Sequence, residues 1–315
     1  MKKILVTGGC GYMGSILIPK LLNKGYFVVC LDIQWFGCHL KESSNLEIIK
    51  SDIRNIDSLN LENIDSIIHL ANVANDPAVE LNPTMSWEIN VLASQQLIDK
   101  AVRENVKHFI FASSGSVYGI KSEEKVTEDL TLVPISTYNK TKMVAERVLM
   151  SYSDKLQVHC IRPATVCGLS PRMRLDVAVN LLTFQALSRN QITVLGGSQV
   201  RPNIHIDDIT DLYLHLLSNM SSIPSGFYNA GFENISILDI AEMIRTRTNC
   251  DIKIEKSNDP RSYRQDSSKI LKTGFIPKKK VGDAIEEIIE AYNNKKLEDT
   301  AESHTVNWMK KNNIK

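Results

Sequence analysis

The sequence predicts an α/β fold in which a doubly wound parallel sheet carries a smaller C-terminal substrate domain. Short, almost continuously apolar runs alternate with longer helical patterns through the first half of the chain, which is typical of a parallel sheet covered by helices on both faces. Beyond about residue 165 this alternation gives way to loops marked by proline and glycine, where a second domain can be assembled.

The apolar runs have the length and the β-branched content of strands, and turn residues flank them. The predicted strands are Lys3–Thr7, Phe27–Leu31, Glu47–Lys50, Ser66–Leu70, His108–Ser113 and Val158–Arg162. The helical patterns between them are clearest over Met13–Lys24, Thr84–Glu104 and Tyr138–Ser153. Pro19 should kink the first helix because it lacks an amide donor, and Gly25 stands where a left-handed capping residue is expected.

The chain divides into two predicted domains. Residues 1–167 form the sheet domain and 201–224 return to it, because Asn203–Ser218 has the pattern of a short strand leading into a helix. The smaller domain takes residues 168–200 and 225–315. A chain of 315 residues can bury a substantial core without disulfides or a structural metal.

Charge and composition exclude several classes of function. The 37 Lys and Arg residues nearly balance 36 Asp and Glu, so the net charge of +1 offers no broadly basic surface for nucleic acid or membranes. No apolar run reaches the ~18 residues of a membrane helix, and the first strand is too short for a signal peptide. A cytoplasmic protein is expected, with reduced cysteines and, as the alternative, a Cys160–Cys167 disulfide.

No metal site is predicted. The six cysteines show neither a CxxC pair nor a cysteine/histidine spacing suited to zinc. Asp207 and Asp208 could mimic a metal site, but acidic residues at the start of a helix explain them at least as well. His205 is expected to be a packed, hydrogen-bonded core residue.

A glycine-rich turn, Thr7-Gly8-Gly9-Cys10-Gly11-Tyr12-Met13-Gly14, connects the first strand to the first helix. Glycines at 8, 11 and 14 can supply the tight turn, the close backbone approach and the helix N-terminus that a dinucleotide pyrophosphate needs. Asp32 ends the second strand, where a carboxylate binds ribose hydroxyls and repels a 2′-phosphate, so NAD is favoured over NADP. Asp52 either meets the adenine amino group or caps a helix.

A second group of polar residues follows the fifth strand. Ser114 lies just beyond its end, and Tyr138 and Lys142 are four residues apart on a predicted helix, hence on one face. The lysine ammonium is expected to lower the pKa of the tyrosine, which then exchanges a proton with an oxygen held by the serine. The combination indicates oxidation or reduction of a carbon that carries a hydroxyl group.

With these features the sequence resembles the extended short-chain dehydrogenase/reductase family, in particular its nucleotide-sugar epimerases and dehydratases. The resemblance implies a Rossmann-like NAD domain, a smaller sugar-nucleotide domain, and Ser114, Tyr138 and Lys142 as the catalytic set. The motifs that carry it cover nearly the whole chain: TGGCGYMG from Thr7, HLAN from His69, SSGSVYG from Ser113, YNKTK from Tyr138, RPATVCG from Arg162, NIHIDD from Asn203 and DSSKI from Asp266.

The resemblance implies further site residues. Asn90 matches an asparagine that supports the active site from within a helix, and Asn180 one that contacts the substrate diphosphate. Arg201, Arg261 and Arg264 correspond to positions that bind the nucleotide, with a surface ion pair as the alternative for each. Arg172 and Arg174 face either the sugar or solvent. The implied cofactor-binding residues are Gly8, Gly11, Tyr12, Met13, Gly14, Asp32, Asp52, Ile53, Leu70, Ala71, Tyr138 and Lys142.

Two departures from the family pattern bear on the reaction. Gly115 and Ser116 stand where hexose dehydratases carry an Asp-Glu pair, which disfavours a 4,6-dehydratase. Thr165 stands where hexose 4-epimerases typically carry asparagine, so the resemblance does not fix the sugar.

The expected function is that of an NAD-dependent nucleotide-sugar epimerase acting through transient oxidation at C4. The alternatives are a nucleotide-sugar 4-dehydrogenase or 4-ketoreductase in surface-polysaccharide sugar biosynthesis, and a non-catalytic NAD-binding sensor. A nucleotide sugar is the expected partner. The resemblance further implies a homodimer formed through the helices at Thr84–Glu104 and Tyr138–Ser153.

Overall fold

The computed structural model describes residues 1–256 and 262–314. Seven of the described strands form one parallel sheet in the order β10-β6-β5-β4-β1-β2-β3. The strand order reverses beside β1, and such a point in a doubly wound sheet is where ligands bind at the carboxyl ends of the strands. The strands are β1 (Lys3–Thr7), β2 (Phe27–Asp32), β3 (Leu46–Lys50), β4 (Ser66–His69), β5 (His108–Ala112), β6 (Gln157–Pro163) and β10 (Gly226–Ala230).

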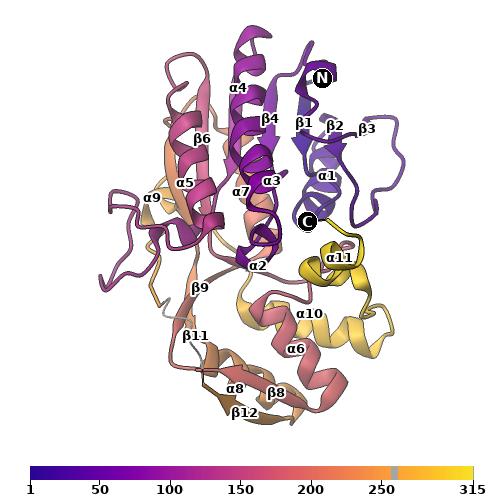
Figure 1. Ribbon diagram of the computed structural model, residues 1–315, viewed down its shortest axis with the longest axis vertical. Helices are drawn as coiled ribbons and strands as arrows, with labels where there is room; N and C mark the ends of the chain where they lie inside the picture. The colour runs from indigo at the N-terminus through magenta and orange to yellow at the C-terminus, as the bar shows by residue number, and fades with distance from the viewer. Residues whose placement is uncertain (257–261, 315) are drawn as a thin grey trace.

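Helices cover both faces of this sheet (Figure 1). Successive residues of β1 point to opposite faces: Leu5 joins a core with α4 and α5, whereas Ile4 and Val6 join a core with α1 and α7. The predicted doubly wound α/β fold is therefore confirmed. The four helices are α1 (Gly14–Asn23), α4 (Ala93–Arg103), α5 (Thr137–Met150) and α7 (Ile206–Ser218).

The first helix follows its prediction closely. Pro19 lies inside α1, which nevertheless continues to Asn23. Gly25 follows with a φ of +80°, the left-handed conformation expected of a residue just past a helix end.

The helix predicted over Thr84–Glu104 is interrupted. A π-helical turn, η2 (Glu88–Leu92), separates α3 (Pro83–Trp87) from α4, and the short helix α2 (Asp76–Val79) precedes them. Such turns occur frequently at functional sites, because the extra residue in the turn redirects nearby side chains. The turn contains Asn90.

The second domain is built on a small parallel sheet of β8 (Gln191–Leu195) and β12 (Asp251–Glu255). Three helices pack around a core that includes Leu182, Ile240 and Ile285 (Figure 1). They are α6 (Ala178–Arg189), α8 (Ile237–Thr248) and α10 (Val281–Asn293). A further sheet of the described residues, β11 (Glu233–Ser236), β9 (Val200–His205) and β7 (Thr165–Cys167), joins this domain to the large sheet.

Two segments assigned to the smaller domain from sequence lie on the large one instead. β10 pairs with β6, so the returning segment extends beyond residue 224. The helix α11 (Thr305–Lys311) inserts Met309 into the core of the sheet domain, and Trp308 stacks on Trp35 after β2. The predicted boundary at residue 225 is therefore wrong, because long-range pairing rather than local composition decides where these segments pack.

The remaining elements are short: η1 (Ile56–Ser58), η3 (Gly115–Tyr118), α9 (Ser268–Leu271) and η4 (Ala301–Ser303). Over the described ranges, we find no helix with the length and apolar character needed to cross a membrane. All the cysteines are free thiols, including Cys160 and Cys167, so the alternative disulfide is not formed.

Candidate active site

The glycine-rich turn lies between β1 and α1 and depends on two glycines for its shape. Gly8 has a φ of +71°, and a Cβ atom there would lie 2.6 Å from the Ala71 nitrogen. A Cβ atom on Gly14 would lie 2.5 Å from the Gly9 Cα. Both contacts are too short for any other residue, so the turn is held close to the end of β4 and the start of α1 stays open.

Asp32 lies at the end of β2, beside this turn. Its carboxylate accepts hydrogen bonds from the backbone N–H of Cys10 at 2.9 Å and of Gln34 at 2.6 Å. Burial nevertheless raises the pKa of Asp32. Asp52 and Ile53 lie nearby, and Asp52 forms an ion pair with Arg54 at 2.7 Å while also accepting a hydrogen bond from its backbone N–H.

A cavity of about 570 Å³ extends from the glycine turn to the residues that follow β5. This volume is typical of a small-molecule site. It brings together two groups that are far apart in the sequence. Its lining includes Gly8, Gly11, Tyr12, Met13, Gly14, Asp32, Asp52, Ile53, Leu70, Ala71, Ser114, Tyr138 and Lys142.

Tyr138 and Lys142 lie one turn apart on α5, and Ser114 caps η3 opposite them. Burial raises the pKa of Tyr138 to about 12, although the nearby Ser114 side chain acts in the opposite direction. Lys142 is 1% exposed and donates to the Ala112 carbonyl oxygen at 2.7 Å. Burial lowers the pKa of Lys142 to about 7.

The pKa values of Tyr138 and Lys142 correct the expectation that Lys142 lowers the pKa of Tyr138, because in the cofactor-free protein this effect is not seen. The Lys142 Nζ lies 6.0 Å from the centre of the Tyr138 ring and is directed to a backbone carbonyl. With its pKa near 7, the lysine is only partly protonated at neutral pH. Burial of the phenol therefore has the larger effect.

Asn90 holds the elements around this group together. Its carboxamide oxygen accepts from the Val73 N–H at 2.8 Å, and its nitrogen donates to the Val73 carbonyl at 3.2 Å and the Thr141 hydroxyl at 3.1 Å. The contact with Thr141 lies beside Lys142 on α5. Asn90 therefore positions the loop after β4 against α5, as its place in the π-helical turn allows.

A polar network that the sequence did not indicate supports the same site. The Ser114 and Ser116 hydroxyls are 2.7 Å apart, and the Asn139 amide donates to Ser116 at 2.9 Å. Asn139 also donates to the Asp76 carboxylate at 3.3 Å, and so does Ser136, the N-cap of α5. The available signal was the Asp76-Pro77 pair, which indicates a helix start rather than a site.

The negative charge of Asp76 also acts on the tyrosine. Asp76 lines the same cavity as Tyr138. Burial is the main cause of the raised pKa of Tyr138, and the charge of Asp76 raises this pKa further, whereas the Ser114 side chain and the charge of Arg174 lower it. The pKa of the Tyr138 phenol is thus subject to the opposing charges of an acidic and a basic side chain.

Two arginines of the segment after β7 line the cavity. The Arg172 guanidinium lies 3.9 Å from the centre of the Phe36 ring and donates to the Thr305 hydroxyl at 3.2 Å. It is 4% exposed, and its Nε has no hydrogen-bond partner among the described residues. Burial, with the charge of Arg174, lowers the pKa of Arg172 to about 9. Arg174 instead forms an ion pair with Asp176 at 2.7 Å.

The residues expected to bind substrate phosphates lie elsewhere. Asn180 is fully buried, and its amide donates to the Tyr12 hydroxyl and the Gly168 and Arg174 carbonyls. Arg201 on β9 and the exposed Arg264 are outside the cavity lining. Arg261 lies outside the described residues. Their contacts with substrate stay predictions, whereas Arg172 and Arg174, left open by the sequence, reach the cavity.

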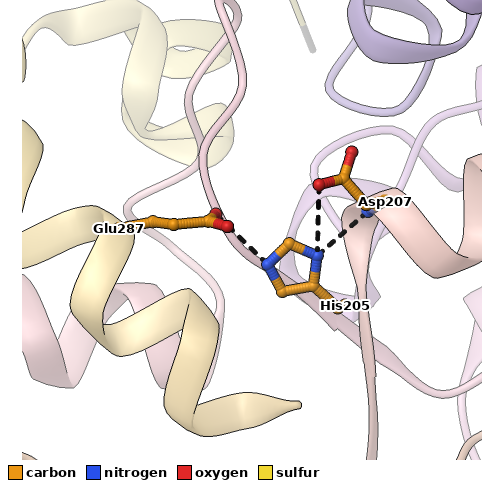
Figure 2. A group of neighbouring side chains, drawn as sticks. All are labelled: His205, Asp207 and Glu287. Atoms are coloured by element: carbon orange, nitrogen blue, oxygen red, sulfur yellow. Dashed lines mark hydrogen bonds and ion pairs between the residues drawn. The ribbon is translucent and has the colours of Figure 1, made fainter. Parts of the chain in front are cut away.

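His205, Asp207 and Glu287 form the cluster that most resembles a metal site (Figure 2). His205 Nε2 lies 3.2 Å from Glu287, and its Nδ1 accepts from the Asp207 N–H at 3.1 Å. Lys20 and Lys279 pair with the two carboxylates, each at 2.9 Å. These groups already satisfy one another across α7 and α10, so they join the two domains without requiring a cation.

The comparisons with known proteins agree with this geometry. Residues 4–231 match the NAD dependent epimerase/dehydratase family. The chain belongs to this family. The resemblance seen in the motifs is thereby confirmed, and the enzyme class is that of NAD-dependent enzymes that modify nucleotide sugars.

Relatives within the family carry different activities. UDP-glucose 4-epimerase of Lactobacillus helveticus is 28% identical to this chain, and the match covers 88% of this chain and 92% of the relative. UDP-glucuronic acid decarboxylase 1 of Danio rerio is 28% identical to this chain, and the match covers 97% of this chain and 76% of the relative. The structure of UDP-glucuronic acid 4-epimerase from Bacillus cereus, in complex with UDP-glucuronic acid and NAD, has a TM-score of 0.81 at 29% identity, covering 93% and 99% of the two chains.

The cavity of this family member fits its cofactor, NAD. The start of α1 at the glycine turn and the carboxylate of Asp32 line this cavity, and both are features that dinucleotide-binding sites use. Arg172 carries a buried positive charge without an ion-pair partner among the described residues, and its free Nε calls for an acceptor. An anionic diphosphate bound in the cavity would supply such an acceptor.

Replacing Arg172 with Met is expected to weaken NAD binding by about 10- to 100-fold, which is the loss of one buried charge-assisted contact. The free energy of unfolding of the cofactor-free protein should not fall, because the variant removes an uncompensated buried charge. Calorimetric titration with NAD measures the affinity. Arg189→Met, an exposed change at the end of α6, is the control and should leave it unchanged.

Replacing Lys142 with Met should abolish activity. Below pH 7 it should stabilise the cofactor-free protein by about 2–4 kcal/mol, which is the cost of burying the charged lysine less the contribution of its hydrogen bond to Ala112. Between about pH 7 and the ordinary lysine pKa, the unfolded chain binds one more proton than the folded one, so wild-type stability rises with pH. The gain from Lys142→Met should therefore shrink toward pH 10. Urea unfolding at several pH values measures it, with the exposed Lys140→Met as control; a gain that does not vary with pH would contradict the burial of a charged lysine.

Proposed function

We propose that this chain is a nucleotide-sugar 4-epimerase, which oxidises C4 of the sugar transiently and reduces it from the opposite face. The observation that carries the proposal is that Ser114, Tyr138 and Lys142 line the cofactor cavity together, with Tyr138 and Lys142 one turn apart on the same helix. Binding NAD alone does not require this group, which argues against a non-catalytic sensor.

Each residue of the group has a distinct part in the proposed reaction. Tyr138 takes the proton of the 4-hydroxyl and returns it after inversion, while the Ser114 hydroxyl holds the C4 oxygen. When bound, NAD supplies the acceptor and donor of the C4 hydride. Because the pKa of Tyr138 is about 12 in the cofactor-free chain, its deprotonation is what the loaded site has to favour. Lys142, which would hold the cofactor ribose, is the adjacent cation that can do so.

The residues after Ser114 support epimerisation over dehydration. A dehydratase needs a separate acid and base to eliminate water, and Gly115 and Ser116 provide neither. A side chain on Gly115 would be crowded, since its Cβ would lie 3.2 Å from the Gln265 amide, the Pro163 carbonyl and the Tyr263 hydroxyl, which would have to shift by a few tenths of an ångström. Ser116 is hydrogen-bonded within the network that holds Ser114.

The proposed substrate is a nucleotide diphosphate sugar, as in the relatives named for UDP-glucose and UDP-glucuronic acid. Arg174 and Asp76 line the same cavity as Tyr138 and are placed to select the groups that the sugar carries. We also propose that the chain forms a homodimer through α4 and α5. The exposed Trp87 at the end of α3 and Leu92 directly before α4, at 37% and 49%, support this face. Light scattering of the purified protein tests the dimer.

The proposal is tested by incubating the protein and NAD with UDP-, dTDP-, GDP- and ADP-linked hexoses and uronic acids. Proton NMR should show one of them converted to its C4 epimer, without accumulation of reduced nicotinamide. Stoichiometric reduced nicotinamide would identify a dehydrogenase instead. Carbon dioxide release or a 4-keto-6-deoxy product would identify a decarboxylase or a dehydratase, and each of these outcomes contradicts the proposed epimerase.

A further inference from the structure

Three thiols that are separate in the sequence meet beside the cofactor cavity. Cys10 belongs to the glycine turn, Cys30 to β2, and Cys38 to the loop that follows β2. The Cys10 Sγ lies 3.3 Å from the Cys38 Sγ and 3.9 Å from the Cys30 Sγ. Cys38 is exposed, whereas Cys10 and Cys30 are buried. A reagent from solution can therefore reach the cluster through Cys38.

The closest pair spans the part of the cavity where the cofactor's adenosine half is expected. Cys10 lines the cavity, and its backbone N–H donates to Asp32, the predicted ribose ligand. Phe36 and Gly37, which immediately precede Cys38, line the same end. A covalent bond between the two sulfur atoms would thus connect the diphosphate-binding turn to the loop beside the ribose site.

We propose that Cys10 and Cys38 are a redox modification site, in which a reversible disulfide weakens the binding of NAD. The oxidant is a low-molecular-weight disulfide, RSSR, of the glutathione class. The Cys38 thiolate attacks one sulfur of RSSR, forms a mixed disulfide and releases one RSH. The Cys10 thiolate then attacks the Cys38 sulfur and releases the second RSH, so the two protein thiols are oxidised while RSSR is reduced to two RSH.

The packing around the thiols indicates which side must move. A disulfide bond is about 2.05 Å long, so the two sulfur atoms must approach by about 1.3 Å. The turn has little room to shift, because the backbone of Gly8 and Gly9 packs so closely on its neighbours that even a Cβ atom would lie 2.6 Å from the Ala71 nitrogen and 2.5 Å from the Cys30 Sγ. The loop beyond β2 moves instead, at Gly37 with its φ of +79°, and it draws Phe36 and Gly37 toward Asp32.

This displacement narrows the ribose end of the cavity. We expect the oxidised protein to bind NAD about tenfold more weakly, comparable to the loss of one or two hydrogen bonds. Because coupling between two binding events is reciprocal, saturating NAD should slow formation of the disulfide by excluding the oxidised conformation. Reduction should restore the affinity.

The test treats the cofactor-free protein with oxidised glutathione near pH 8.5. Alkaline conditions help because contact with Cys30 and burial raise the pKa of Cys10, and partial burial raises that of Cys38. Trypsin leaves Cys10 in the peptide 4–20 and both Cys30 and Cys38 in the peptide 25–41. Mass spectrometry without reductant should find these two peptides linked in the wild type and in Cys30→Ala, but not in Cys38→Ser.

Titration with NAD before and after oxidation, and again after dithiothreitol, measures the functional effect. Wild type should lose and then regain affinity, whereas Cys38→Ser should keep the reduced protein's affinity throughout. A link that persists in Cys38→Ser, or no link under conditions that oxidise a model dithiol, would overturn the assignment of the pair. A complete Cys10–Cys38 link with unchanged NAD affinity would overturn the proposed effect on the cofactor.

Discussion

Tyr138→Phe is expected to lower kcat for epimerisation by on the order of 10²–10⁴-fold, the usual contribution of a positioned proton-transfer group. The ring keeps its packing, but the atom that takes the 4-hydroxyl proton is gone. NAD affinity should change little, because the phenylalanine still closes the wall of the cavity. Initial rates over a range of nucleotide-sugar concentrations separate kcat from KM, and calorimetry measures the cofactor.

The matched control is Tyr152→Phe. Tyr152 lies just beyond the end of α5, is hydrogen-bonded to Asp99 and lies outside the cavity lining. The Tyr152→Phe variant should retain the wild-type kcat. If Tyr138→Phe also turns over normally, the proton is exchanged by another group and the proposed mechanism fails.

Glu146→Leu is expected to cost about 3–5 kcal/mol of stability, the largest effect that we expect outside the cavity. Glu146 lies on α5, one turn beyond Lys142, and is fully buried. Its carboxylate accepts from Arg162 Nε at 2.9 Å and Nη2 at 2.8 Å, and Arg162 itself is 1% exposed on β6. The substitution leaves the guanidinium buried and without its carboxylate.

A double variant distinguishes the effect of the Glu146–Arg162 ion pair from the effect of losing side-chain packing. Glu146→Leu combined with Arg162→Met removes both charges, so it should recover most of the stability lost by the single change. Urea unfolding of the two single variants and the double variant measures the coupling between the side chains. Additive losses in this cycle would show that the ion pair does not hold α5 on the sheet.

The sequence predicted those parts of the fold that local pattern determines. The β1 strand, the glycine turn and α1 follow one another within about twenty residues, and each has a strong local signal. Ser114, Tyr138 and Lys142 were recognisable because strand ends and helix spacing place them on one side of the cavity. Local sequence pattern was therefore sufficient to predict the doubly wound sheet and to select three residues that line one cavity.

The rest depends on contacts between distant segments. The docking of α11 through Met309 and Trp308 has no local signal, and neither has the pairing of β10 with β6. The position of Arg172 in the cavity lining depends on its packing against Phe36 and Thr305, which composition does not reveal. The raised pKa of Tyr138 likewise follows from burial, whereas the sequence showed only a lysine nearby.

The central claim, transient oxidation at C4 with return of the same hydrogen, is tested most directly with a nucleotide sugar that carries deuterium at C4. The substrate is the one that the panel identifies, and NMR and mass spectrometry locate the label after many turnovers. The account predicts that the epimerised product keeps its deuterium at C4 and gains none from heavy water. Loss of the label to solvent, or incorporation of solvent deuterium at C3 or C5, would contradict it.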